Sequence, residues 1–568
     1  MFKLYYTIII ACFISATLLS QGDCTGSTAK DRLNVNNINA NIGVSDMISF
    51  IDYPTYEYPK GSGISALFNA NLWMGGYDDQ GQLKLAAQTY RQSGTDFYPG
   101  PIPEEGTTPA VDICSEYDKL FTVYGEDIDN FASIYNANNG VIEEVDIPES
   151  MRNYPGKNNP FLQGKMYLPQ DRDIAPFYDL DGDGDYNPMN GDHPSLENGK
   201  PAFADQMIFK VINDAGNVHT ESGGEIMKME IGVMAYSFQT EDELNNATFF
   251  NYTLNYRGSS TLNDFYLGIF VDPDLGQWDN DYVGCIPDEN IGYVYNGPEI
   301  DLEYETIPIL GIQILEGMKN EMDEEIKMTS FLAYYNDFSV NGNPETALQH
   351  YNYLRGNWKD GSSVIDNNNE ETTLMYPGDP SNTDEWSECN SGEQASDKRF
   401  IMAMGPVNFE PGESKTFKKC ILITNKQSHY CGDTKISDLT DLGDMATAFV
   451  ENDFGFTGSP IEMPEDTTTV EPEDTTTLAL SEFRANQLKV NTYPNPASNF
   501  VFFEFNSPDV RFDKLIIRSI EGLEVYNTDI SVASKKIQMN RGSLKSGVYF
   551  YQFYDKEKII TTGKFIFE

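Results

Sequence analysis

The sequence predicts a mainly β protein: two or more β-sandwich domains of the immunoglobulin-like kind with few helices, followed by a small β-sandwich at the C-terminus. Aromatic residues make up 13% of the 568-residue chain, with 34 Tyr and 34 Phe. Gly (46) and Pro (29) are plentiful, and apolar residues alternate with polar ones between turn signals. These features are typical of antiparallel sheets joined by tight turns.

The N-terminus predicts a signal peptide over residues 1–22. Lys3 precedes an apolar stretch over 5–19, and small and polar residues follow it. A stretch of about 15 apolar residues is short for a bilayer-spanning helix, so we expect no transmembrane span in the mature chain. The alternatives are a membrane anchor and a lipoprotein that uses Cys24, although Asp23 stands where a lipoprotein needs a small residue.

Strand pairs follow along the rest of the chain. The clearest hairpin joins 247–256, in which Thr248, Phe250, Tyr252, Leu254 and Tyr256 alternate with other residues, to the similar pattern over 265–271. Further hairpins are expected from 66–74 with 83–90, and from 400–404 with 416–424. One helix is expected over 437–452, because apolar residues recur there at helical spacing, and it would close a sandwich.

A linker separates two modules of different charge. Pro-Glu-Asp-Thr-Thr-Thr occurs at 464–469 and again at 472–477, and such a stretch has little to bury. Residues 489–568 carry 11 basic and 9 acidic residues, a net charge of +2. Because the whole chain has a net charge of −50, residues 1–488 carry −52. We expect five regions along the chain. They are a signal peptide (1–22), an N-terminal β-rich region (23–220), a β-sandwich with a closing helix (221–455), an acidic Pro/Thr linker (456–488) and a terminal sandwich (489–568).

The overall charge and the cysteines restrict partners and compartment. With 88 acidic against 38 basic residues the chain would repel a phosphate backbone, which excludes nucleic acid as a partner. The mature chain keeps an even set of cysteines, which in an exported protein predicts disulfides. Their pairing stays open, because six cysteines allow 15 pairings: Cys24, Cys114, Cys285, Cys389, Cys420 and Cys431.

The last eighty residues carry a recognisable pattern. Residues 490–498 read Val-Asn-Thr-Tyr-Pro-Asn-Pro-Ala-Ser, 544–551 read Leu-Lys-Ser-Gly-Val-Tyr-Phe-Tyr, and 563–565 read Gly-Lys-Phe. This pattern resembles the type A sorting domain of the type IX secretion system of Bacteroidetes. The motif residues carried by the resemblance are Tyr493, Pro494, Asn495, Pro496, Gly547, Tyr549 and Lys564.

The resemblance implies a route rather than an activity. It implies export by Sec to the periplasm, passage through the outer membrane by the type IX machinery, and often removal of the domain with attachment to surface lipopolysaccharide. Segments of the body at 58–63, 72–76, 88–94 and 352–361 are similar to large tagged exoproteins of the same bacteria. That similarity implies no particular chemistry.

The strongest candidate site in the body is an acidic loop. Calcium needs six to eight oxygens on a tightly turning chain, and Asp at positions 1, 3 and 5 with Gly at position 6 begins an EF-hand-type loop. Position twelve is Asn190 instead of Glu, so Asp192 is the candidate replacement ligand. We expect a structural Ca²⁺ here, with a plain acidic loop as the alternative, and the predicted ligands are Asp179, Asp181, Asp183, Asp185, Asn187 and Asp192.

A second acidic cluster follows the strand that ends at Val271. Asp272, Asp274, Asp279 and Asp281 lie in one loop, and loops leaving a sandwich edge often carry metal or ligand contacts. Their spacing fits no standard cation loop. We expect a cation here as well, with a solvated turn as the alternative.

Enzyme signatures are few. The four histidines form no HExxH pair, and neither a GxSxG elbow nor a GxxxxGK[ST] phosphate loop occurs. We therefore predict an exported cell-surface or secreted protein with a structural, adhesive or ligand-binding role, and an extracellular glycan or surface lipopolysaccharide as candidate partner. The alternative is a secreted carbohydrate-active hydrolase with Asp or Glu as acid and base. Candidate sugar-stacking residues, each also compatible with ordinary packing, are Trp73, Trp278, Trp358 and Trp386.

Overall fold

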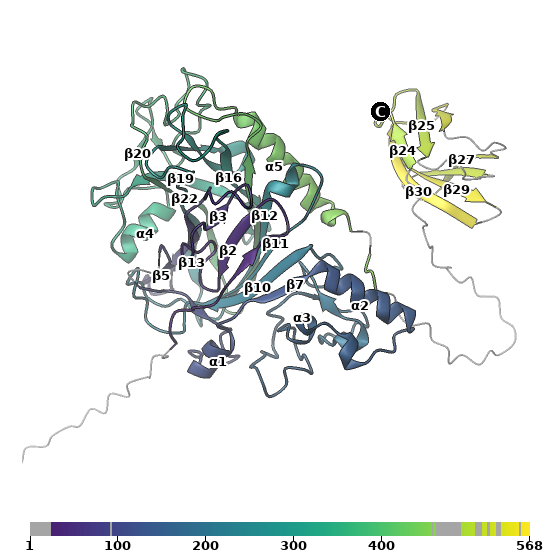
Figure 1. The fold of residues 1–568 in the computed structure, drawn as a ribbon, viewed down its shortest axis with the longest axis horizontal. Coiled ribbons are helices and arrows are strands. Elements are labelled where there is room, and N and C mark those ends of the chain that lie inside the picture. The colour runs from purple at the N-terminus through teal and green to yellow at the C-terminus, as the bar shows by residue number, and fades with distance from the viewer. Residues whose placement is uncertain are drawn as a thin grey trace, which may run out of the picture. The chain divides into compact units, whose positions relative to one another are not determined.

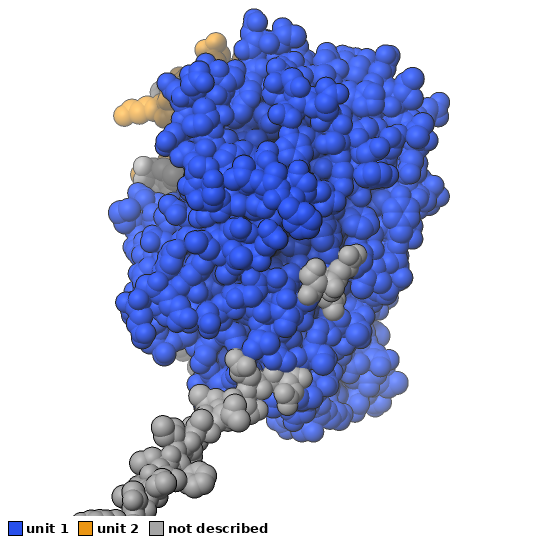
Figure 2. All heavy atoms as spheres, turned by 90° about the vertical axis from the view of Figure 1, so that its left-hand side faces the viewer, with its two compact units in different colours: residues 1–466 blue, residues 467–568 orange. Residues whose placement is uncertain are grey.

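The computed structural model describes residues 24–90, 94–456 and 458–461, and, nearer the C-terminus, 490–505, 514–519, 523–529, 536–542, 544–555 and 558–567. The expected signal peptide and residues 462–488 of the expected linker lie outside these ranges. The chain forms two compact units that divide between residues 466 and 467 (Figure 1), and Figure 2 colours them separately. We call the described part of the first unit the body.

Two antiparallel sheets build the body, as the alternating pattern predicts. The expected hairpin of 66–74 with 83–90 is confirmed. The expected hairpins of 247–256 with 265–271 and of 400–404 with 416–424 are wrong, because in each case the two strands lie in different sheets. The five-stranded sheet has the order β19 (Met328–Tyr335), β22 (Lys398–Phe409), β13 (Leu262–Asp272), β4 (Asn69–Tyr77) and β5 (Leu83–Ala87). The nine-stranded sheet has the order β14 (Asp281–Ile286), β15 (Ile291–Asn296), β16 (Ile309–Glu316), β23 (Ser414–Thr424), β12 (Ala247–Tyr256), β11 (Met229–Ser237), β10 (Gln206–Asn213) and β6 (Tyr98–Pro99), with β7 (Phe121–Tyr124) also paired to β10.

Smaller elements surround these sheets. The short strands are β1 (Lys30–Leu33), β2 (Asn39–Gly43), β3 (Tyr56–Glu57), β8 (Phe177–Tyr178), β9 (His193–Pro194), β17 (Met318–Lys319), β18 (Glu325–Ile326), β20 (Val364–Ile365) and β21 (Glu371–Thr372). The α-helices are α1 (Val111–Glu116), α2 (Gly125–Ala137), α3 (Glu149–Arg152), α4 (Ala347–Leu354) and α5 (Ile436–Glu451). Single 3₁₀ turns are Glu144–Asp146, Pro188–Asn190, Glu243–Asn246, Pro287–Glu289 and Asp453–Gly455.

The nine-stranded sheet is buried on both faces. On β12, Phe250 and Tyr252 join the same apolar core as Phe265 and Leu267 of β13, so the two large sheets pack as a sandwich. Phe249, between Phe250 and Thr248, points instead into a second core. That second core includes side chains of α2 and α5, so helices cover the outer face of this sheet (Figure 1).

The expected boundary between residues 220 and 221 is wrong. β10 and β11, on either side of it, pair over eight residues from Gln206–Ser237 to Asn213–Glu230. β4 and β5 likewise complete the sheet that contains β13 and β22. Neither half completes either of the two large sheets or the two large apolar cores alone, so the body is one unit.

The expected helix over 437–452 is confirmed as α5, which buries Leu439, Leu442 and Ala446. α2 was not predicted, although its sequence carries the same signal. Ile128, Phe131, Ala132 and Tyr135 recur at helical spacing and are all buried. Among the described residues, no helix is long and apolar enough to span a bilayer.

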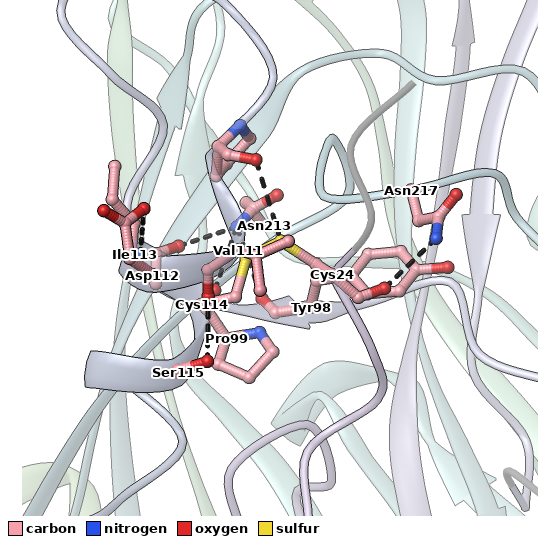
Figure 3. The surroundings of a disulfide bond; sticks show 12 residues. Cys24, Tyr98, Pro99, Val111, Asp112, Ile113, Cys114, Ser115, Asn213 and Asn217 are labelled. Atoms are coloured by element: carbon pink, nitrogen blue, oxygen red, sulfur yellow. Dashed lines mark hydrogen bonds between the residues drawn. A yellow bond between two sulfur atoms is a disulfide. The ribbon is translucent and has the colours of Figure 1, made fainter. Parts of the chain in front are cut away.

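Disulfides are confirmed and their pairing is now defined. Cys24 bonds to Cys114 (Figure 3), and Cys389 bonds to Cys431. The first bond occupies the sulfur that the lipoprotein alternative requires, and the Cys24 carbonyl accepts a hydrogen bond from Asn217 Nδ2 at 3.1 Å (Figure 3). The other two cysteines among the described residues, Cys285 and Cys420, are buried free thiols.

The C-terminal unit is a small sandwich, as expected. One sheet has the order β24 (Val490–Tyr493), β25 (Phe500–Phe505) and β28 (Lys536–Asn540), and the other has the order β27 (Glu524–Asp529), β26 (Lys514–Ser519), β29 (Gly547–Asp555) and β30 (Lys558–Phe567). Phe503 of the first sheet and Phe553 and Phe565 of the second share one core. This unit therefore has a core of its own and can be treated as an independent domain.

Candidate functional site

The Tyr-Pro-Asn-Pro segment joins the beginning of the C-terminal unit to its end. Asn495 Oδ1 accepts a hydrogen bond from the Ile566 backbone N–H at 2.8 Å. Two residues later, the Ala497 N–H donates to the Ile566 carbonyl at 2.8 Å. The segment is thereby fixed to β30, while Pro494 and Pro496 are exposed. A rigid turn with an exposed face results.

The other motif residues divide into packed and exposed groups. Tyr549 is buried in the core of the unit, and its hydroxyl donates to the Lys545 carbonyl at 2.8 Å. Tyr493 is 37% exposed, and Lys536 Nζ donates to its hydroxyl at 2.7 Å. Gly547, which begins β29, and Lys564 on β30 are exposed. A recognition partner can therefore reach most of the motif directly.

The first acidic loop brings only three of its predicted ligands together. Oxygen atoms of Asp179, Asp181 and Asp192 lie within 4.8 Å of one another. Asp192 is buried, and its carboxylate accepts from the Leu180 and Asn187 N–H groups at 2.8 Å each. Burial, together with the charges of Asp179 and Asp181, raises the pKa of Asp192 to about 7.

The remaining predicted ligands of this loop hold the chain instead. Asp183 accepts from the Asp185 N–H at 2.8 Å, and Asp185 accepts from Asn158 Nδ2 at 2.5 Å. Asn187 accepts from the Met189 N–H at 3.1 Å. The loop thus satisfies its carboxylates with its own backbone and nearby amides, and the calcium assignment stays a prediction.

The second acidic cluster has a different membership from the predicted one. Oxygens of Asp272, Asp274 and Asp397 lie within 4.8 Å of one another. Asp397 was missed because it comes much later in the chain, immediately before β22. Asp279 is exposed and accepts from Gln277 Nε2 at 2.5 Å, and it is not part of the cluster.

An arginine and a tyrosine support this cluster. Arg399 Nη2 lies 3.3 Å from Asp272 Oδ2, and its Nη1 also pairs with Asp397. The Tyr90 hydroxyl donates to Asp272 Oδ2 at 2.6 Å and accepts from Arg399 Nε at 2.7 Å. Burial raises the pKa of Asp272, and burial together with the charge of Asp272 raises that of Asp274.

A cleft of about 520 Å³ is a third candidate site, on the body. Its lining includes Trp358, Trp386, Tyr335 and Tyr376, so two of the four predicted tryptophans meet here. Trp73 instead lies in the core, stacked on a phenylalanine, and Trp278 is 57% exposed outside the cleft. The volume is typical of small-molecule binding sites in proteins.

Charged groups in the cleft wall are fixed by contacts with each other. Lys398 Nζ lies 2.7 Å from Glu388 Oε1, with both side chains 1% exposed, and 4.2 Å from the centre of the Tyr335 ring. The Tyr335 hydroxyl donates to Glu393 Oε2 at 2.7 Å. Burial raises the pKa of Glu388 despite its lysine partner. The Cys389–Cys431 disulfide anchors the loop that carries Glu388.

Comparisons with known proteins define the C-terminal unit and leave the body open. The comparison with curated proteins found no match. Among solved structures, the chain is similar to a polysaccharide lyase at 10% identity and a TM-score of 0.18, over 63% of this chain and 39% of that one. It is also similar to a protein assigned as a kojibiose phosphorylase from human microbiome, at 9% identity and a TM-score of 0.20, over 45% and 24%.

The chain thus spans less than half the length of either of these proteins, and scores this low carry no argument about fold or function. Residues 491–568 match the family of the secretion system C-terminal sorting domain. The matched range covers the strands of the small sandwich from within β24 to the end of β30, including every motif residue described above. The C-terminal unit therefore matches this family, and the match supports the prediction of a Bacteroidetes protein tagged for the type IX secretion system.

Proposed function

We propose that the body of this secreted protein binds an extracellular glycan in the aromatic cleft. The observation that carries the proposal is the meeting of Trp358 and Trp386, each half-buried, with Tyr335 and Tyr376 around one polar cavity. Flat aromatic faces stack on the apolar faces of sugar rings, and the polar groups between them can bond to hydroxyls.

The charge of the cleft favours a neutral sugar. Lys398 is the one basic residue in the lining, and it is already paired with Glu388. Asp366, which is half-buried, and Asp384 and Glu385, which are exposed, also line the cavity. An anionic polysaccharide would meet uncompensated carboxylates, so uronic acid chains fit poorly.

A glycan array with the purified mature protein tests this proposal. We expect binding to neutral oligosaccharides, and Trp386→Ala should weaken it by at least about ten-fold, because a stacking surface is lost. Trp278→Ala is the matched control, since Trp278 is exposed and does not line the cleft. Failure to bind any neutral glycan, or equal losses in both variants, would contradict the proposal.

A carbohydrate-active hydrolase is the second candidate, favoured by the raised pKa of Glu388 in an aromatic cleft. Glu388 is poorly placed for proton transfer, however, because Oε1 is paired with Lys398 and Oε2 accepts from the Val283 N–H at 2.7 Å. Release of reducing sugar that is abolished by Glu388→Gln would establish the enzyme. Binding without release favours the non-enzymatic role.

The sorting domain suggests the route. We infer that Sec delivers the chain to the periplasm, and that the type IX machinery then exports it and attaches it to surface lipopolysaccharide. Removing residues 489–568 should leave the body in the periplasm, measured by cell fractionation. Retained glycan binding by the truncated protein is the control for folding, and a truncated protein found at the surface or in the medium would refute the route.

A further inference from the structure

Three segments of the body meet at one end of the five-stranded sheet. Asp272 is the last residue of β13, with Asp274 two residues later, and Asp397 directly precedes β22, which pairs with β13. The third segment is the start of β14, where the Asp281 carbonyl accepts a hydrogen bond from the Ser396 N–H at 3.3 Å. The fold thus gathers carboxylates from distant parts of the sequence.

Two of these carboxylates are buried and incompletely bonded. Asp272 is 1% exposed and Asp281 is 0% exposed. Among the described residues, Oδ1 of each has no hydrogen-bond partner, although Asp281 Oδ2 accepts from the Leu275 N–H at 3.1 Å. A buried carboxylate oxygen without a partner is costly, and native proteins normally satisfy such atoms with a donor, a water or a cation.

The local charge is also unbalanced. Asp272, Asp274, Asp281 and Asp397 carry four formal negative charges, and Arg399 is the single basic residue that pairs with the cluster in the described structure. Arg399 and Tyr90 contact Asp272 through Oδ2. They therefore fix that carboxylate while its other oxygen remains available.

We propose that Asp272, Asp274 and Asp397, with Asp281 behind them, bind a divalent cation of the Ca²⁺ type. The oxygens of the first three lie within 4.8 Å of one another, and two oxygens on opposite sides of a Ca²⁺ ion stand about 4.6–5.2 Å apart. The donors are all carboxylate oxygens, which hard cations prefer, whereas zinc usually takes nitrogen or sulfur. The cation would brace β13, β14 and β22 against one another.

The experiment isolates this cluster from the acidic loop. In the full-length mature protein, Asp179→Asn with Asp181→Asn removes the charge of two of the three clustered carboxylates of the loop; Asp181 is exposed and Asp179 is half-buried. Calorimetric titration of this double variant with CaCl₂, after treatment with EDTA, should still show about one bound ion per chain. Adding Asp274→Asn should weaken that binding by at least about ten-fold, and adding Asp183→Asn should leave it unchanged.

A second measurement keeps the proposal testable if a variant folds poorly. Tb³⁺ replaces Ca²⁺ and emits when a nearby aromatic ring is excited, and Tyr90 lies beside Asp272. The double variant should therefore give Tb³⁺ emission that Ca²⁺ displaces and that Asp274→Asn removes. No calcium uptake by the folded double variant, or uptake and emission unaffected by Asp274→Asn, would overturn the proposal.

Discussion

The two acidic clusters of the body differ in how their carboxylates are compensated. One is a single loop, and the other combines residues that are distant in sequence. The loop around Asp179 is one short stretch of chain, and its carboxylates accept hydrogen bonds from the Gly182 and Gly184 N–H groups at 2.7 and 2.8 Å. The cluster around Asp272 combines the loop after β13 with Asp397, which is distant in sequence, and two of its buried oxygens have no partner among the described residues. The loop can thus exist as an ordinary acidic turn, whereas the second cluster depends on Arg399 or a cation.

The largest expected effect is on the assembled cluster. Arg399→Met should lower the free energy of unfolding in EDTA by about 3–5 kcal/mol, because it leaves buried carboxylates without their arginine. Denaturation with urea measures the loss. Added CaCl₂ should recover part of it, since a cation bound only by the folded state stabilises that state.

A matched arginine gives the control for this prediction. Arg152 pairs with Glu144 at 3.3 Å, and both side chains are substantially exposed, at 32% and 65%. Arg152→Met should therefore cost less than about 1 kcal/mol. Equal losses for the two arginines would show that the cluster around Asp272 is no more dependent on its cationic partner than a surface pair is.

The same contrast explains which features the sequence could predict. Local patterns were sufficient for the sorting motif at Tyr493 and for α5, because all their residues lie within one short stretch. The strands over 247–256 and 262–272 were also predictable, since their alternation reflects a face buried in a sandwich. The hairpin expected between them was wrong, because they lie in opposite sheets. In each case the information lies in neighbouring residues.

Features that depend on long-range pairing were not predictable in this way. Asp397 joins Asp272 only because β22 pairs with β13, and no spacing rule connects them. The body is one unit because β10 pairs with β11 across the expected boundary. Trp358 and Trp386 were named as candidates, but nothing in the sequence placed them in one cleft. α2 is the exception, since its helical spacing was visible at Ile128 and Phe131.

The second prediction concerns the hydrogen bonds that fix the acidic loop around Asp179. Asp192→Ala should cost about 2–3 kcal/mol in EDTA, because two backbone N–H groups, those of Leu180 and Asn187, would lose their acceptor at a buried position. Asp183→Ala should cost less than about 0.5 kcal/mol, since Asp183 is exposed. Thermal melts measure both. If Asp192→Ala were as mild as Asp183→Ala, the loop would not owe its shape to these hydrogen bonds.

The smallest expected effect concerns Glu221, which positions Tyr90 beside the cluster around Asp272. Glu221 accepts from the Thr89 and Tyr90 N–H groups at 2.7 and 3.1 Å, so it holds the tyrosine that donates to Asp272. Burial raises the pKa of Glu221 to about 7 from an ordinary value near 4.5, which means that folding favours its protonated form. Its contribution to stability is therefore complete below about pH 4.5 and is lost as the pH rises through 7.

Solvent screening reduces the size of this change, because Glu221 is not fully buried. We expect the free energy of unfolding to fall by about 1–2 kcal/mol between pH 4.5 and 7.5. Glu221→Gln should make that part of the stability profile less steep, because glutamine carries no proton to lose over this range. Glu225→Gln, at an exposed position in the same segment, should leave the profile unchanged. A profile equally steep with glutamine at 221 would mean that another group controls the pH dependence, and that the support behind Tyr90 does not titrate in this range.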